Sequence, residues 1–71
     1  MNNEYSKLPV KGAATYQPEK LATGRWAIVM YPEGEENGSV VQTCKKFETA
    51  QKAAERWQLK ENKAVLSTIN S

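Results

Sequence analysis

The sequence contains no histidine, no aspartate and a single cysteine, Cys44, among its 71 residues. Without histidine, the usual proton donor and acceptor near neutral pH is missing. Neither a Ser-His-Asp nor a Cys-His arrangement can therefore be assembled within one chain, and zinc sites with several cysteine or histidine ligands are excluded as well. The four glycines are too dispersed for a phosphate-binding loop. We expect no enzymatic activity, no metal and no cofactor.

Long apolar runs are also lacking. No stretch approaches the roughly 20 apolar residues that cross a bilayer, and residues 1–4 do not begin a basic, apolar leader. A lone cysteine forms no internal disulfide, so nothing ties the chain to an oxidising compartment. We expect a cytoplasmic protein without a membrane partner, in which Cys44 is a small buried hydrophobic residue.

The length suits one small domain over residues 1–71, with a flexible tail at residues 1–6. A chain of this size buries only about 60% of the surface that its unfolded state exposes. Two tryptophans, three tyrosines and one phenylalanine supply most of the bulk for a thin core. A homodimer is one way to add burial.

The middle of the chain predicts a β-hairpin with strands at 25–31 and 39–47. Residues 25–31 are apolar, aromatic and β-branched, as in a half-buried strand. Alternation places Trp26, Ile28 and Met30 on one face. On the returning strand it separates Val41 from Val40 and Cys44. Asn37-Gly38 suits a turn that requires a positive φ.

Residues 49–61 predict an amphipathic helix. Thr49 suits the N-cap, and Asn62 is a candidate stop. One apolar stripe has the spacing i, i+3, i+4, i+7, and its members are Ala50, Ala53, Ala54 and Trp57. Residues 64–69 are β-branched enough for a short closing strand, with a frayed tail as the alternative.

The fold class expected from this pattern is α+β. A small antiparallel sheet would pack against the helix, so that the Trp57 stripe lies on the inner side of the Trp26 hairpin. Because two strands alone are marginal in water, a third strand is expected. The N-terminal zone, within residues 13–17, is the first place to look for it.

Basic residues outline one candidate binding surface. On the helix, Lys52, Arg56 and Lys60 recur every four residues, opposite the apolar stripe. The hairpin region adds Arg25, Lys45 and Lys46. Together these side chains could contact the phosphates of a nucleic acid. A solvated helix face is the other interpretation of the same charges.

A second set of residues suggests a protein partner instead. Glu33, Glu35 and Glu36 give the hairpin loop a charge that could attract a basic surface. Leu59 and Leu66 could form an apolar patch, and an exposed sheet edge could accept a strand. The β-β-α outline favours nucleic acid, whereas the near-balanced net charge of +2 favours protein.

The stretch from Gly24 to Ala54 carries a family resemblance. Gly24-Arg25-Trp26 opens a strand, a turn follows, and Phe47-Glu48-Thr49 leads into a helix that contains Ala53-Ala54. This outline resembles the arm-binding domains of phage-type integrases, the plant ethylene-response DNA-binding domains, and strand-turn-strand-helix modules of small phage and bacterial proteins. The resemblance implies a three-stranded sheet in the DNA major groove with a helix behind it. It maps DNA contacts to Arg25, Lys45 and Lys46.

Overall fold

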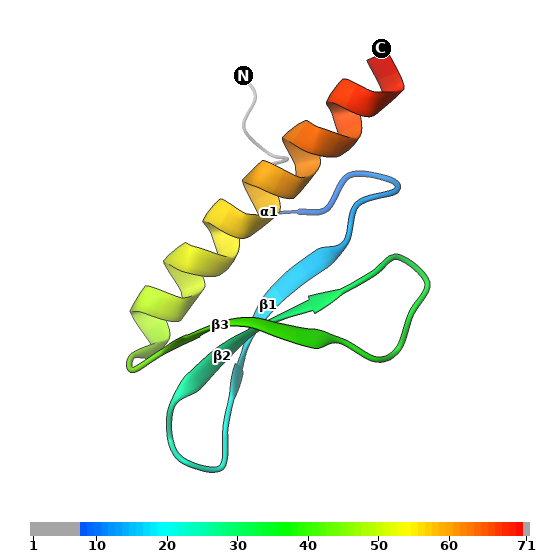
Figure 1. Cartoon of the computed structure of the whole chain (residues 1–71). Coiled ribbons are helices and arrows are strands. Elements are labelled where there is room, and N and C mark those ends of the chain that lie inside the picture. The colour runs from blue at the N-terminus through cyan, green and yellow to red at the C-terminus, as the bar shows by residue number, and fades with distance from the viewer. Residues whose placement is uncertain (1–7, 71) are drawn as a thin grey trace.

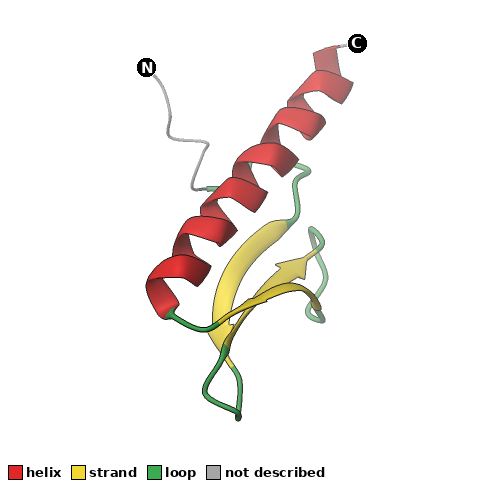
Figure 2. Cartoon of the chain, turned by 60° about the vertical axis from the view of Figure 1, so that its left-hand side comes forward, coloured by secondary structure: helices red, strands yellow, loops and turns green. Residues whose placement is uncertain are grey.

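Three strands and one helix make up the protein, in the order β1 (Thr15–Lys20), β2 (Trp26–Tyr31), β3 (Ser39–Cys44) and α1 (Phe47–Asn70). This computed structural model describes residues 8–70, except for the side chains of residues 69 and 70. The tail expected at residues 1–6 lies outside the described residues. The strands form one antiparallel sheet in the order β1-β2-β3, and α1 covers one of its faces (Figures 1 and 2). The predicted α+β fold is confirmed.

The third strand is found in the N-terminal zone, as expected, although it begins at Thr15 rather than Ala13. It pairs with β2 over its whole length, from Thr15 opposite Tyr31 to Lys20 opposite Trp26. Pro18 is tolerated because β1 is an edge strand, where the missing backbone donor removes no ladder bond. The two hairpin strands are shorter than predicted, so Arg25, Lys45 and Lys46 lie just outside the sheet.

A β-bulge changes which side chains of β3 face the core. Ile28 pairs with Gln42 and Val29 pairs with Val40, which leaves Val41 as the extra residue. Bulges interrupt the alternation of side chains. Val41 therefore packs against the core while Val40 is 56% exposed, whereas Cys44 is buried as predicted.

Gly38 has a different role from the one expected. Positive φ angles occur at Gly12, Gly24 and Gly34, and Gly38 is not among them. A Cβ atom at Gly38 would lie 2.6 Å from a Val29 methyl carbon and 2.8 Å from the ring of Tyr31. Glycine is required there because the chain passes close to β2, not because of turn geometry.

The core forms where α1 crosses the sheet. Ile28 and Cys44 from the sheet meet Ala50, Ala53 and Ala54 from the helix, and all five are buried. Alanines allow close approach of helix and sheet, so this part of the predicted stripe is confirmed.

The two tryptophans have separate partners. Trp57 lies on the inner side of the Trp26 hairpin, as predicted, where its indole N–H donates to Gln42 of β3. Its ring also stacks on Tyr16 of β1 at 5.5 Å between centroids. Trp26 instead packs against Phe47, with ring centroids 4.8 Å apart. Trp57 is only partly buried, and it remains packed against the same core cluster.

The helix is nearly twice as long as predicted. It begins at Phe47, where the Ala50 N–H donates to the Lys46 carbonyl, and it continues to Asn70. Thr49 is therefore not the N-cap, Asn62 is not a stop, and residues 64–69 are neither a strand nor a frayed tail. No glycine or proline follows Lys60, and the β-branched residues beyond it lower helix propensity only slightly.

Polar side chains of the helix hold the segment that precedes β1. Asn62 accepts a hydrogen bond from the Val10 N–H (3.2 Å) and donates to the Leu8 carbonyl (2.9 Å). Gln58 accepts from the Tyr16 N–H (2.9 Å) and donates to the Ala14 carbonyl (2.8 Å). Asn62 and Gln58 are 0% and 1% exposed. A buried asparagine therefore continues the helix because its side chain bonds the backbone of another segment.

Candidate nucleic-acid interface

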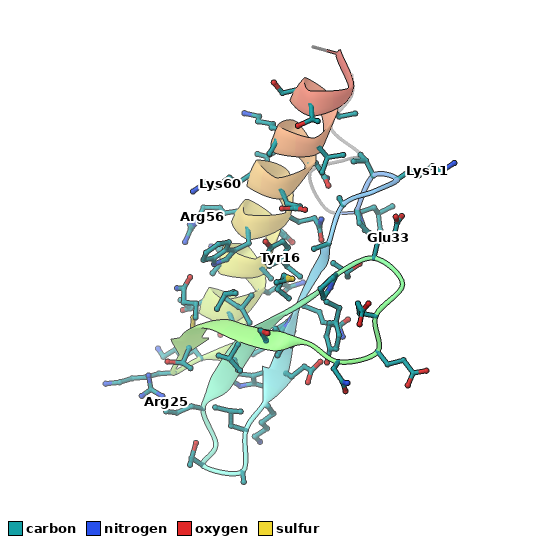
Figure 3. The ribbon with its side chains drawn as sticks, turned by 45° about the vertical axis from the view of Figure 1, so that its right-hand side comes forward. Lys11, Tyr16, Arg25, Glu33, Arg56 and Lys60 are labelled. Atoms are coloured by element: carbon teal, nitrogen blue, oxygen red, sulfur yellow. The ribbon has the colours of Figure 1, made fainter. Side chains whose placement is uncertain are left out.

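Three of the predicted basic residues form a row along α1. Lys52, Arg56 and Lys60 are all exposed, and each lies one turn, about 6 Å, further along the axis than the last. Figure 3 shows Arg56 and Lys60 extending from the same side of the helix, away from the sheet. Lys63 is also exposed and lines a surface hollow together with Arg56 and Lys60. We call Lys52, Arg56, Lys60 and Lys63 the helix cation row.

Several carboxylates are engaged elsewhere. Glu61 accepts the Ala14 N–H (3.0 Å), and Glu33 accepts the Gly12 N–H (2.9 Å). Glu19 accepts the Tyr31 hydroxyl and the Gln17 amide on β1 and β2. Within residues 8–70, no member of the helix cation row has a carboxylate within ion-pair distance. Glu55 lines a hollow with Lys52 and Arg56, and Glu61 lines one with Lys60. The row is thus a stripe of four cations that make no ion pair within residues 8–70, with Glu55 and Glu61 beside it.

The remaining predicted cations do not join this row. The Arg25 guanidinium reaches the Thr43 hydroxyl at 3.5 Å, and Thr43 pairs with Ala27 in the sheet. Because the neighbouring Trp26 and Ile28 face α1, Arg25 and Thr43 lie on the opposite face. Lys45 and Lys46 are exposed in the connection between β3 and α1. The predicted cations therefore occupy two surfaces, with the sheet between Arg25 and the helix cation row.

Two of the hollows beside the helix cation row are also lined by Trp57. One, of about 210 Å³, is lined by Gln42, Ala53, Arg56, Trp57 and Lys60. The other, of about 200 Å³, is lined by Tyr16, Trp57, Lys60, Glu61 and Ala64. Trp57 and Lys60 border both. Tyr16 and Gln42 were not identified from the sequence, because nothing in a local pattern shows that β1, β3 and α1 meet at one point.

The environment of the two described tyrosines shifts their ionisation. Burial, with a smaller contribution from the nearby Glu61 carboxylate, raises the pKa of Tyr16 above 10.0. The hydrogen bond to Glu19 is the main cause that raises the pKa of Tyr31. Both hydroxyls are therefore neutral near pH 7, where they can donate hydrogen bonds without adding negative charge to the surface.

The residues predicted to contact a protein are dispersed. Glu33 is tied to Gly12 on the side of the molecule away from Arg56 and Lys60 (Figure 3), whereas Glu35 and Glu36 are exposed in the β2–β3 loop. Leu59 and Leu66 are half-buried, two turns apart on α1. Because residues 64–69 continue the helix, they do not fold back over Leu59.

Among residues 8–70, no group of three or more acidic or cysteine side chains could hold a metal ion. In the same part of the chain, no helix is both long enough and apolar enough to span a membrane.

Comparison with protein-family models, with curated proteins and with solved structures found no match to this chain. The resemblance to integrase arm-binding domains therefore stays a prediction, and the fold and the surface carry the functional argument.

Proposed function

We propose that the protein is a non-enzymatic nucleic-acid-binding module that contacts phosphates through the helix cation row. The observation that carries the proposal is the absence, among the described residues, of any acidic partner for Lys52, Arg56, Lys60 and Lys63, while Glu61 and Glu33 bind backbone N–H groups. Unpaired cations spaced along a helix match the repeating charge of a nucleic acid backbone.

Arg25, Lys45 and Lys46 form a second set of phosphate ligands in this proposal. They would act from the sheet side, which is the surface that the integrase resemblance implies. Arg25 points away from α1. A single nucleic acid lying on one surface of the protein therefore cannot contact both Arg25 and the helix cation row. The two sets are therefore tested separately.

Binding is measured by fluorescence anisotropy of a labelled oligonucleotide, titrated from low to physiological salt. Replacing Lys52, Arg56 and Lys60 with glutamine together should weaken binding at low salt by roughly tenfold or more. The slope of log affinity against log salt should become shallower by about 2–3, because about 0.7–0.9 is lost for each phosphate contact.

The control variant carries Lys11→Gln and Lys20→Gln, two exposed cations on the N-terminal segment and β1. It is compared with Arg56→Gln/Lys60→Gln, which changes the net charge by the same amount. If the two double variants lose the same amount of affinity, the effect comes from net charge alone. A loss confined to Arg25→Gln/Lys45→Gln/Lys46→Gln would transfer the binding surface to the sheet. No binding at low salt by the unaltered protein would contradict the proposal.

A protein partner is the second candidate function, because the two edges of the sheet differ. On β1 the Tyr16 N–H is taken by Gln58, whereas within residues 8–70 no backbone group of β3 is hydrogen-bonded to an element other than β2. β3 carries no charged residue, and Val40 is 56% exposed. Such an edge can accept a strand from another protein. Val40→Lys should abolish a nuclease-resistant interaction if this edge is used, and should leave oligonucleotide binding unchanged.

A further inference from the structure

The Tyr16–Trp57 pair is placed unusually for a core contact. The rings are nearly parallel, 17° apart, and both residues are only partly buried. Trp57 forms a wall of two adjoining hollows, and Lys60 borders both of them. Arg56 lines the hollow on the β3 side. An aromatic wall and two cations therefore share one small concave region beside β3.

The orientation of Trp57 is held by hydrogen bonding as well as by stacking. Its indole Nε1–H donates to the Gln42 side-chain oxygen at 2.9 Å, and Tyr16 packs against its ring. A side chain held on two sides loses little further rotamer freedom when a ligand arrives. The site is thus organised before binding.

The size and the lining of the two hollows restrict the class of ligand that they can bind. Each hollow, at about 200 Å³, is smaller than the roughly 300–1,000 Å³ of ordinary small-molecule pockets, which suits one planar ring rather than a whole cofactor. Arg56 and Lys60 supply charge for a phosphate next to that ring. Glu61 lines the second hollow, so an anionic group is better placed on the Arg56 side.

We propose that these hollows bind an unpaired nucleobase with its phosphate, so that the preferred ligand is a single-stranded nucleic acid. The inference rests on the proposed function and names its ligand class. In a duplex the base faces are stacked and only their edges are accessible in the grooves. In a single strand the faces are free to stack on aromatic side chains while cations follow the backbone.

The test uses Trp57 as its own reporter. The chain has two tryptophans, so Trp26→Phe leaves Trp57 alone and keeps an aromatic ring against Phe47. An oligothymidylate of about 12 nucleotides is titrated against this variant, in parallel with a duplex of equal length and with thymidine monophosphate. The single strand should quench Trp57 emission and bind roughly tenfold more tightly than the duplex. Thymidine monophosphate should bind more weakly than the single strand.

Matched variants separate the site from general charge. Lys60→Gln and Lys63→Gln remove the same charge from adjacent turns, but Lys60 borders both Trp57 hollows and Lys63 borders neither. Lys60→Gln should weaken single-strand binding several-fold more than Lys63→Gln does, with no such difference for duplex. Tyr16→Leu should weaken single-strand binding by roughly tenfold. Tyr16→Phe keeps the ring and should retain single-strand binding. This variant tests the site if Tyr16→Leu fails to fold.

The outcomes distinguish this inference from the function on which it rests. No binding of either oligonucleotide at low salt overturns both. Duplex binding equal to or tighter than single-strand binding, with unchanged Trp57 emission, overturns the base-stacking site and leaves the proposed function standing. Monophosphate binding as tight as that of the strand also overturns it, because the ligand would then be a free nucleotide.

Discussion

The two halves of α1 pack against the rest of the protein by different means. The first half, around Ala50, Ala53 and Ala54, lies on the sheet through apolar contacts. In the second half, which continues to Asn70, the residues from Gln58 to Asn62 reach the segment before β1 through hydrogen bonds to its backbone. Figure 1 shows this segment beside the middle of the helix, whose C-terminal end extends past the sheet. One helix thus carries an apolar and a polar interface in succession.

The difference shows how polar residues can build a core contact. The segment at residues 8–14 has no ladder of its own, and buried backbone groups need partners. Glutamine and asparagine side chains each offer a donor and an acceptor. Gln58 and Asn62 can therefore bond both N–H and carbonyl groups of the N-terminal backbone. The apolar half provides burial, and the polar half determines where the N-terminal segment lies.

The largest effect is expected in the apolar half. Ile28→Ala should lower the free energy of unfolding by about 3 kcal/mol, because Ile28 is fully buried and its removal leaves a cavity under the alanines. Urea unfolding followed by circular dichroism measures the change. Val40→Ala, at an exposed position on the adjacent strand, is the control and should stay within about 0.5 kcal/mol. Equal losses in the two variants would contradict the assigned core.

Asn62→Ala tests the polar half. It should cost about 2 kcal/mol, because the Val10 N–H and the Leu8 carbonyl lose their buried partner. Amide hydrogen exchange should become faster at Val10 through local opening. The Ile28 amide in β2 should still exchange only through global unfolding. If Val10 exchange follows global unfolding unchanged, the N-terminal segment is held by something other than this side chain.

A double-mutant cycle sharpens the comparison. Gln58 donates to Asn62 as well as to Ala14, so the two side chains act as one network. Gln58→Ala and Asn62→Ala should be non-additive by about 1 kcal/mol. The pair Ile28→Ala and Asn62→Ala, one from each half, should add within about 0.5 kcal/mol. Non-additivity of that second pair would show that the two halves of the helix are not independent.

The smallest effect is expected from pH. Tyr16 has a raised pKa in the folded state, so its contribution to stability is complete below pH 10.0 and is lost as the pH rises through the folded pKa. Absorbance at 295 nm, taken as the difference from Tyr16→Phe, follows this ionisation. Glu61→Gln should lower the pKa of Tyr16 only in part, since burial is the larger cause. An unchanged pKa would contradict the contribution of Glu61.

Local pattern was sufficient for the elements that pack by periodicity. The Trp26–Tyr31 strand, the alanine stripe and the burial of Cys44 follow from alternation and helical spacing. The cations of α1 were placed outward for the same reason, and they are exposed, although Lys60 borders the stripe at Trp57 rather than lying opposite it. The third strand was placed in the right zone because two strands alone rarely suffice.

The errors occur where a residue has a partner distant in the sequence. Asn62 suggested a helix end because its usual local partner is the backbone, whereas here it bonds the backbone of Val10 and Leu8, more than 50 residues away. Val41 was separated from Cys44, although both contact the core, because the bulge depends on the pairing between β2 and β3. The stacking of Trp57 on Tyr16 was not predicted, because the position of β1 under the helix was not known.

The sequence by itself determined that this chain is a small α+β protein without histidine or aspartate, with an alanine-lined helix whose cations face outward. Those features depend on composition and on repeats of two or 3.6 residues, which any reader of the chain can count. The tertiary structure alone decided that Tyr16, Gln42, Trp57 and Lys60 meet around two hollows, and that Arg25 lies on the opposite face. Such meetings depend on long-range packing of three strands and a helix, which no local spacing encodes.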